Sequence, residues 1–210
     1  MKMHEKTWSM TVLAMFSAII ILLALTPIGF IPLPFVRATT VHIPVIVGSL
    51  LLGPKAGAVL GLMFGLTSLF NNTFNPNITS FVFSPFYNLP GQDSGSWFAF
   101  IVVFVPRILV GVVPWYVSAG LKKVMNENYM PVNWAISGVA GSLTNTLLVM
   151  HFIFLFFREP WGNVRGIGAS VYGAILGIIA TNGVPEAIVA GVIVVALMGA
   201  LTAARRVQAG

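Results

Sequence analysis

The sequence contains no cysteine, only five acidic residues, and three histidines that lie far apart along the chain. Without cysteine the chain can form neither a disulfide nor a thiolate metal site, so we expect no bound metal. The sequence also lacks a phosphate-binding loop, a dinucleotide-binding glycine motif, a nucleophile elbow and a pair of neighbouring carboxylates. These absences argue against an enzyme, and we expect no cofactor.

Apolar residues dominate the chain. Of 210 residues, 57% are hydrophobic and only 8% are charged, and the mean hydropathy is +0.93. A helical crossing of a bilayer core roughly 30 Å thick needs about 20 apolar residues, so the chain has room for about six crossings. We therefore predict an all-α integral membrane protein, a single domain over residues 1–210 with six transmembrane helices. The expected helices span residues 8–25, 41–52, 56–70, 97–121, 134–157 and 182–204, and the expected external loops span 26–40, 71–96 and 158–181.

The 11 basic residues stand singly or in pairs at the ends of apolar runs. This distribution is not that of a nucleic-acid-binding surface, which gathers its basic residues in one patch. If the N terminus is inside the cell, seven of the 11 lie on the cytoplasmic side: Lys2, Lys6, Lys55, Lys122, Lys123, Arg205 and Arg206. Because cytoplasmic loops collect lysine and arginine, we predict that both termini are cytoplasmic. The partners expected from composition alone are the lipids of the cell membrane, and nucleic acid is not among them.

Two expected helices, 41–52 and 56–70, are short and rich in glycine or proline. Interrupted, short hydrophobic segments often border a binding cavity in transport proteins, so we expect a cavity near the outer leaflet. Gly57, Gly61 and Gly65 follow one another at four-residue spacing. This spacing predicts a smooth stripe that packs closely against a neighbouring helix.

Arg107 is the most informative single residue of the sequence, because it is a charged residue deep inside an expected membrane-spanning helix. It lies about ten residues into the expected fourth helix, or roughly 15 Å below the outer surface. A charge at that depth costs at least ~2.5 kcal/mol, so Arg107 should face the interior and hold an anion or a carboxylate. Glu186, the acidic residue in an otherwise apolar run, is an internal candidate. Two interpretations stay open: an Arg107–Glu186 pair that locks two helices, and an arginine that faces a ligand.

Other polar and aromatic side chains are candidates for ligand contact: Asn71, Asn72, Asn75, Tyr87, Asn145, Trp161 and Asn182. Amides both donate and accept hydrogen bonds, which suits a polar ligand. The three asparagines of segment 71–75 are equally explained as helix caps and turn residues, and Asn145 as a residue that holds two helices together. Tyr87 and Trp161 lie in expected outer loops, where they could close over a ligand. We interpret His42 as a satisfied interfacial histidine.

Several motifs together resemble the S component of an energy-coupling factor (ECF) transporter, over essentially the whole chain. They are the AxxxA step at Ala14 and Ala18, the turn "LLGPKAGAVLGL" and the segment "NGVPEAIVAG". Within that family, "HIPVIVGSLLLGPKAGAVLGLMFGLTSLFNNTFNP" and "GSLTNTLLVM" are most similar to the pantothenate-specific branch.

The resemblance implies a subunit of the bacterial plasma membrane that binds one vitamin from outside, beneath its external loops. It implies partners as well: a transmembrane scaffold subunit and two cytoplasmic ATPase subunits, whose ATP hydrolysis would topple the S component. Ala14 and Ala18 match the family's docking step. An S component for another vitamin, such as cobalamin, is an alternative. A solitary ion-coupled secondary carrier is the alternative from a different class, and Glu186 would be its intramembrane acid.

Overall fold

A computed structural model describes residues 2–26, 29–32, 37–167 and 170–209 of the chain. Its longer helices are α1 (Lys2–Leu25), α2 (His42–Leu52), α3 (Pro54–Phe74), α4 (Phe98–Leu121), α5 (Met130–Arg165), α6 (Val171–Ile178) and α7 (Val184–Ala209). A π-helical turn, η5 (Ile179–Gly183), joins α6 to α7, so these three make one helical run. Short 3-10 turns cover Ser80–Val82 (η2) and Glu127–Tyr129 (η3).

Within the described residues, four helical runs are long and apolar enough to cross a membrane. They are Lys6–Leu25, Phe98–Leu121, Glu127–Arg165 and Val171–Ala204. Helix α2 is apolar but has only 11 residues, about 16 Å of helix, which is half the thickness of a bilayer core.

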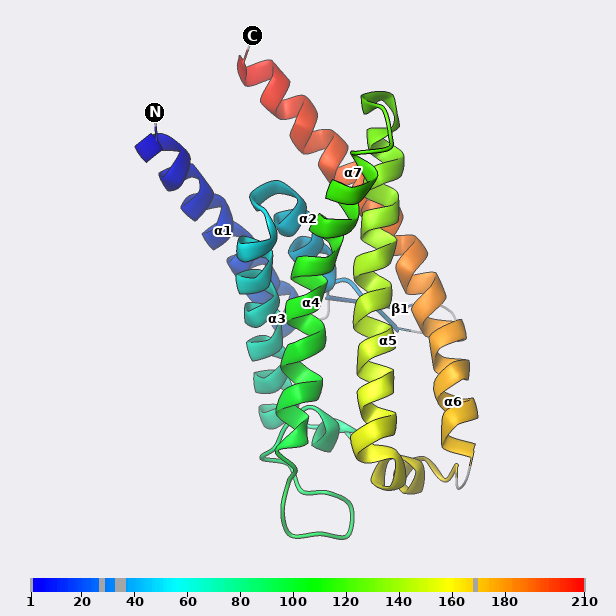
Figure 1. Ribbon diagram of the computed structural model, residues 1–210. Helices are drawn as coiled ribbons and strands as arrows, with labels where there is room; N and C mark the ends of the chain where they lie inside the picture. Colours follow the sequence, from blue (N-terminus) through cyan, green and yellow to red (C-terminus); the bar gives the residue numbers. More distant parts are fainter. Residues whose placement is uncertain (1, 27–28, 33–36, 168–169, 210) are drawn as a thin grey trace.

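The helices form one bundle in which α3, α4 and α5 run side by side (Figure 1). Helix α1 flanks this group on one side, and α6 and α7 flank it on the other. Helix α1 begins and α7 ends at the end of the bundle that also holds the α2–α3 turn, here named the termini end. The segment between α3 and α4 and the α5–α6 connection lie at the opposite end, the loop end.

The glycine stripe of α3 packs against α4. A Cβ atom added at Gly57 would collide with the carbonyl oxygen of Gly111, and one added at Gly61 would collide with that of Arg107. At Gly65 the obstacle is the ring of Phe104, 2.7 Å away. The prediction of a close-packing stripe is confirmed, and the neighbouring helix is α4.

Helices α4 and α5 are antiparallel, and polar and aromatic contacts fix their register. Near the termini end, the Ser118 hydroxyl donates to Asn133 Oδ1 (2.7 Å) and the Asn133 amide donates to the Ser118 carbonyl (3.0 Å). Towards the loop end, the rings of Phe98 and Phe156 stack with centroids 4.6 Å apart. The two helices therefore lie in contact along almost the whole length of α4.

Two apolar clusters fill the bundle, one above the other along its axis. The termini-end cluster includes Phe16, Ile20, Val45, Leu60, Val110, Trp134 and Val194. The loop-end cluster includes Phe81, Val102, Val149, Ile153, Phe157 and Trp161. Residues 103–109 of α4 and 135–148 of α5 lie between the members that these two helices contribute.

The expected external loop 26–40 contains a small two-stranded sheet, which the sequence did not predict, in a fold that is otherwise helical. Strands β1 (Phe30–Pro32) and β2 (Arg37–Thr39) pair antiparallel, with Phe30 opposite Thr39. The hairpin lies beside the middle of the bundle and not at its loop end (Figure 1). Three-residue strands are too short to be stable alone, so contacts with the helices hold the hairpin in place.

The structure also corrects two expectations about element bounds. Helix α3 continues to Phe74 and has 21 residues, so of the two helices expected to be short only α2 is short. Segment 158–181, expected to be a loop, is helical over 158–165 and again over 171–183. The end of α5 that follows Pro160 lies across the loop end of the bundle (Figure 1), where Trp161 is buried.

Candidate functional site

A set of polar side chains lies between the two apolar clusters, and we name it the polar belt. Its members come from five elements: His42, Arg107, Asn145, Asn182 and Glu186. Polar groups are scarce in the interior of a membrane protein because they cost free energy there, and those present usually serve function. The sequence analysis named four of the five as site residues and set His42 aside.

One three-helix contact defines how the belt is built. Ile46 of α2 and Pro114 of α4 both pack against Gly141 of α5, where an added Cβ would lie 2.7 Å from Ile46 and 2.8 Å from Pro114. Residues four apart share a helix face, so one turn nearer the loop end the same faces carry His42 and Asn145. Arg107 lies two turns from Pro114, about 10 Å along α4. The structure therefore brings these three side chains to neighbouring levels of one seam.

The other two members face the same part of α5. A Cβ on Gly183 of η5 would lie 2.8 Å from the Thr146 side chain, so Asn182 is placed next to the level of Asn145. Glu186 follows one turn later, in the first turn of α7. Single π-helical turns inside a helix are frequent at functional sites, and this one stands beside the belt.

Arg107 is buried, with 7% of its surface exposed, and it is not paired with a carboxylate. Its Nη1 donates to the carbonyl of Val102 (2.9 Å), which has no helical donor because its partner in the helix would be the N–H that Pro106 lacks. The guanidinium lies over the ring of Phe83, 5.0 Å from its centroid, and of Phe64, at 5.5 Å. Its Nε is buried without a hydrogen-bond partner.

Glu186 has a different partner, so the Arg107–Glu186 pair, one of the two interpretations of the sequence, is not formed. Its Oε1 accepts a hydrogen bond from the backbone N–H of Thr39, at the end of β2 (2.6 Å). Across the part of the chain that the structure describes, the ion pair found is Arg158–Glu159 on the surface. Glu186 therefore anchors the hairpin to α7, and Arg107 keeps a free donor.

Asn145 presents an unsatisfied acceptor. Its Oδ1 is buried and has no hydrogen-bond partner, so that atom does not hold two helices together. On η5, the Thr181 hydroxyl donates to the carbonyl of Gly177 (2.8 Å) and contacts Asn182 Oδ1 (3.1 Å). The belt thus contains a free acceptor on α5 and a free donor on α4.

The asparagines of segment 71–75 take part in local structure at the loop end. Asn72 Nδ2 donates to the carbonyl of Ser68 (2.8 Å), and Asn72 Oδ1 accepts from the Ser80 hydroxyl (3.0 Å). Asn75 Nδ2 donates to Asn71 Oδ1 (3.2 Å). These bonds tie the end of α3 to the loop that follows, as the helix-end interpretation expects.

Tyr87 and Trp161 lie in different surroundings. Tyr87 lines an opening of about 560 Å³ at the loop end, together with Phe81 and Phe86. Trp161 belongs to α5, is 2% exposed and lies under Arg165, whose guanidinium is 4.6 Å from the ring centroid. Its expected place in an outer loop is therefore wrong, because it is part of the loop-end cluster.

His42 is the belt residue that the sequence interpretation missed. It is 1% exposed, and both ring nitrogens are buried without a hydrogen-bond partner, so it is not a satisfied interfacial histidine. The signal was present in the composition of α2, "HIPVIVGSLLL". A helix that is apolar all round is buried on all sides, so its one ionisable residue had to be buried too.

Ala14 and Ala18 lie on the exposed side of α1, while Phe16 and Ile20 of the same helix point into the termini-end cluster. Substituents on the two alanines would therefore reach outward and not into the bundle.

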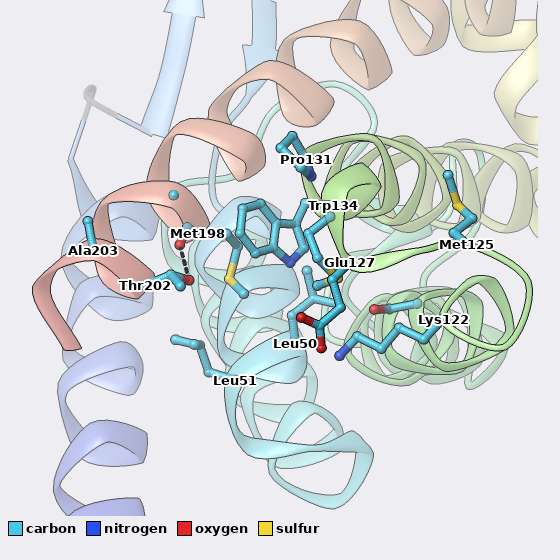
Figure 2. A pocket seen from close by; sticks show the side chains of 13 residues that line it. Leu50, Leu51, Lys122, Met125, Glu127, Pro131, Trp134, Met198, Thr202 and Ala203 are labelled. Atoms are coloured by element: carbon cyan, nitrogen blue, oxygen red, sulfur yellow. Dashed lines mark hydrogen bonds between the residues drawn. The ribbon is translucent and has the colours of Figure 1, made fainter. Parts of the chain in front are cut away.

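A cavity of about 880 Å³ opens at the termini end, away from the belt (Figure 2). Trp134 forms part of its wall, and Lys122 and Glu127 lie at its mouth. Both charged residues are exposed, so water screens them, whereas Arg107 is buried. The polar belt, in which His42 and Arg107 are buried and the other three residues are half-buried, is accordingly the candidate functional site.

Four apolar helical runs among the described residues make the chain a multi-pass membrane protein. The buried Arg107 guanidinium, with its unpartnered Nε, gives it an internal polar site. A family model described as the substrate-specific component of the ECF transporter matches residues 9–198, and the chain belongs to that family. It is 38% identical to the pantothenic acid transporter PanT of Lactococcus lactis subsp. cremoris, over 96% of this chain and 97% of that protein. It is 29% identical to the pantothenate transporter PanT of Leuconostoc mesenteroides, over 93% of this chain and 92% of that protein. The family is one of transporter components, not of enzymes.

Proposed function

We propose that this chain is the pantothenate-binding S component of an ECF importer in the bacterial plasma membrane. The observation that carries the proposal is the 38% identity with a pantothenic acid transporter along nearly the full length of both chains. The polar belt supports the proposal. A buried guanidinium with an unpartnered N–H is costly inside a membrane, and an anionic ligand that accepts a hydrogen bond from that N–H would remove the cost.

The chemistry of pantothenate matches the free groups of the belt. Its carboxylate would accept hydrogen bonds from the Arg107 guanidinium, a charge-assisted pair that is stronger than a neutral one. Its amide N–H would donate to Asn145 Oδ1, the free acceptor one turn away. Because Glu186 is held by Thr39 of the hairpin, its carboxylate is directed to the hairpin backbone and not to the ligand carboxylate.

The remaining site residues take secondary places in this proposal. Asn182 would contact the ligand from η5, and Glu186 holds the hairpin from α7. Asn71, Asn72, Asn75, Tyr87 and Trp161 shape the loop end, through which the vitamin would enter.

In the proposed complex the chain crosses the membrane six times, with both termini cytoplasmic. The distribution of lysine and arginine favours this arrangement. The start of α1 and the end of α7 also lie at the same end of the bundle, as an even number of crossings requires (Figure 1). The loaded chain docks through the Ala14 and Ala18 face on a transmembrane scaffold subunit, which carries two cytoplasmic ATPases. Their ATP hydrolysis topples the S component and delivers the vitamin to the cytoplasm.

The test has two parts. Titration calorimetry on the chain in nanodiscs should show binding of pantothenate and no binding of cobalamin, riboflavin or thiamine. Proteoliposomes should accumulate pantothenate when the scaffold and ATPases are present with ATP. If the isolated chain accumulates pantothenate on an imposed proton or sodium gradient, the alternative of a solitary carrier is correct instead.

A further inference from the structure

We infer that His42 is a ligand-binding residue, which forms a hydrogen bond with a hydroxyl group at the pantoyl end of pantothenate. The inference rests on the proposed function, because it assigns a further contact within the same site. It concerns a residue that the sequence had suggested to be a satisfied interfacial histidine.

The first observation is that the His42 imidazole is buried and unpartnered. Its exposed fraction is 1%, and neither Nδ1 nor Nε2 has a hydrogen-bond partner. A neutral imidazole has one N–H donor and one acceptor nitrogen. Leaving both groups without a hydrogen bond in an apolar interior costs free energy. A ligand that supplies both a donor and an acceptor removes this cost.

The second observation is the direction of the side chain. Ile46 contacts Gly141 at the α4–α5 seam, and His42 lies one turn earlier on the same face of α2. His42 therefore faces the seam at the level of Asn145, whose Oδ1 is also unpartnered. Arg107 lies one turn nearer the loop end, with its free Nε. Unpartnered polar atoms from three helices thus lie on neighbouring levels of a single seam.

The third observation is that the functional groups of pantothenate match the belt residues in order and spacing. In pantothenate the carboxylate, the amide and the hydroxyls follow one another along the chain, so a molecule anchored at Arg107 extends its hydroxyls away from it. One helical turn, about 5.4 Å, separates the Arg107 level from that of His42 and Asn145. The amide then reaches Asn145 and a hydroxyl reaches His42. A hydroxyl both donates and accepts, which is what the two imidazole nitrogens require.

The experiment pairs protein variants with ligand variants. His42→Phe keeps a planar ring and removes both nitrogens, and His42→Gln restores a donor and an acceptor. His151→Phe is the matched control, since His151 is an exposed histidine of α5 outside the belt. The ligands are pantothenate, its analogue with both hydroxyls replaced by hydrogen, and pantothenol, which lacks the carboxylate. Affinities are measured by calorimetry in nanodiscs, and each variant must elute as a single species with a thermal transition.

We expect His42→Phe to weaken pantothenate and pantothenol by the same factor, about 10- to 100-fold, since neither ligand lacks a hydroxyl. The analogue without hydroxyls should bind the wild type weakly and His42→Phe equally weakly. His42→Gln should recover part of the pantothenate affinity, and His151→Phe should change nothing.

Two results would overturn the inference alone: unchanged pantothenate binding by His42→Phe, or an equal loss for pantothenate and the analogue, which would make His42 a structural residue. If His42→Phe does not fold, His42→Leu, which also removes both nitrogens, replaces it in every comparison, and the same two results overturn the inference. A wild-type chain that binds no pantothenate would overturn the proposed function itself.

Discussion

Arg107 has two tasks in the structure, and a pair of substitutions separates them. Its Nη1 donates to the Val102 carbonyl that Pro106 leaves without a helical donor, and its Nε is buried without a hydrogen-bond partner. Arg107→Ala removes both interactions. Pro106→Ala restores the backbone N–H that pairs with Val102. The double variant, Pro106→Ala with Arg107→Ala, therefore keeps the Val102 carbonyl paired but lacks the guanidinium that would bind the ligand and that lies over Phe64 and Phe83.

The magnitudes follow from these contacts. An unpaired buried carbonyl costs about 1–3 kcal/mol, so Arg107→Ala should lower the stability of the ligand-free protein by that amount. The double variant should recover most of it. Truncating one partner of a buried charge pair costs about 2–5 kcal/mol of binding, or roughly 30-fold to several-thousand-fold in Kd. Both the single and the double variant should show this loss for pantothenate.

Calorimetry in nanodiscs measures the binding, and thermal unfolding of the ligand-free protein measures the stability. Pantothenol has no carboxylate, so its affinity should change little in the double variant. Arg107→Lys should recover only part of the pantothenate affinity, because lysine lacks the planar fork that lies over Phe64 and Phe83. A double variant that binds pantothenate as tightly as the wild type would refute the carboxylate contact and leave Arg107 a structural residue.

Three further predictions concern packing, docking and the hairpin. Gly57→Ala should destabilise the protein by about 1–3 kcal/mol in thermal unfolding, because the methyl group meets the Gly111 backbone, whereas Gly173→Ala, with open space around it, should not. Ala14→Trp and Ala18→Trp should leave vitamin binding intact but abolish transport and co-purification with the scaffold. Leu155→Trp, at an exposed position of α5, is the control. Normal assembly of both alanine variants would show that this face is not part of the interface. Glu186→Ala should speed hydrogen exchange of the Thr39 amide by about 10-fold or more, since a net hydrogen bond to a charged group contributes ~1.5–3 kcal/mol. Unchanged exchange would show that this bond does not hold the hairpin.

Much of the architecture was readable from the sequence because hydropathy and small-residue spacing act locally. The long apolar runs predicted membrane-crossing helices, and the spacing of Gly57, Gly61 and Gly65 predicted a close helix contact that the structure contains. Segment 158–165 was misread because its charges and Pro160 suggested a turn. Burial of Phe157 and Trp161, four residues apart on one face, keeps the segment helical.

The candidate site was only partly readable, because it depends on helix registers that a single sequence does not reveal. Arg107 was correctly named as a buried charge. Of the two interpretations left open for it, the ion pair with Glu186 is not formed, because Glu186 accepts a hydrogen bond from the backbone N–H of Thr39 in the hairpin. The hairpin itself was missed because strands of three residues carry almost no pattern. Asn72 shows the opposite case, where a candidate contact residue completes a local hydrogen-bond network.

The two apolar clusters on either side of the polar belt also bear on ion leakage. Each cluster is a layer of closely packed aliphatic and aromatic side chains, and such constrictions exclude water and the ions that travel with it. Among the described residues, the belt is therefore a polar layer with an apolar layer on each side of it. A cell could hold many copies of this subunit, loaded or empty, without dissipating its proton-motive force.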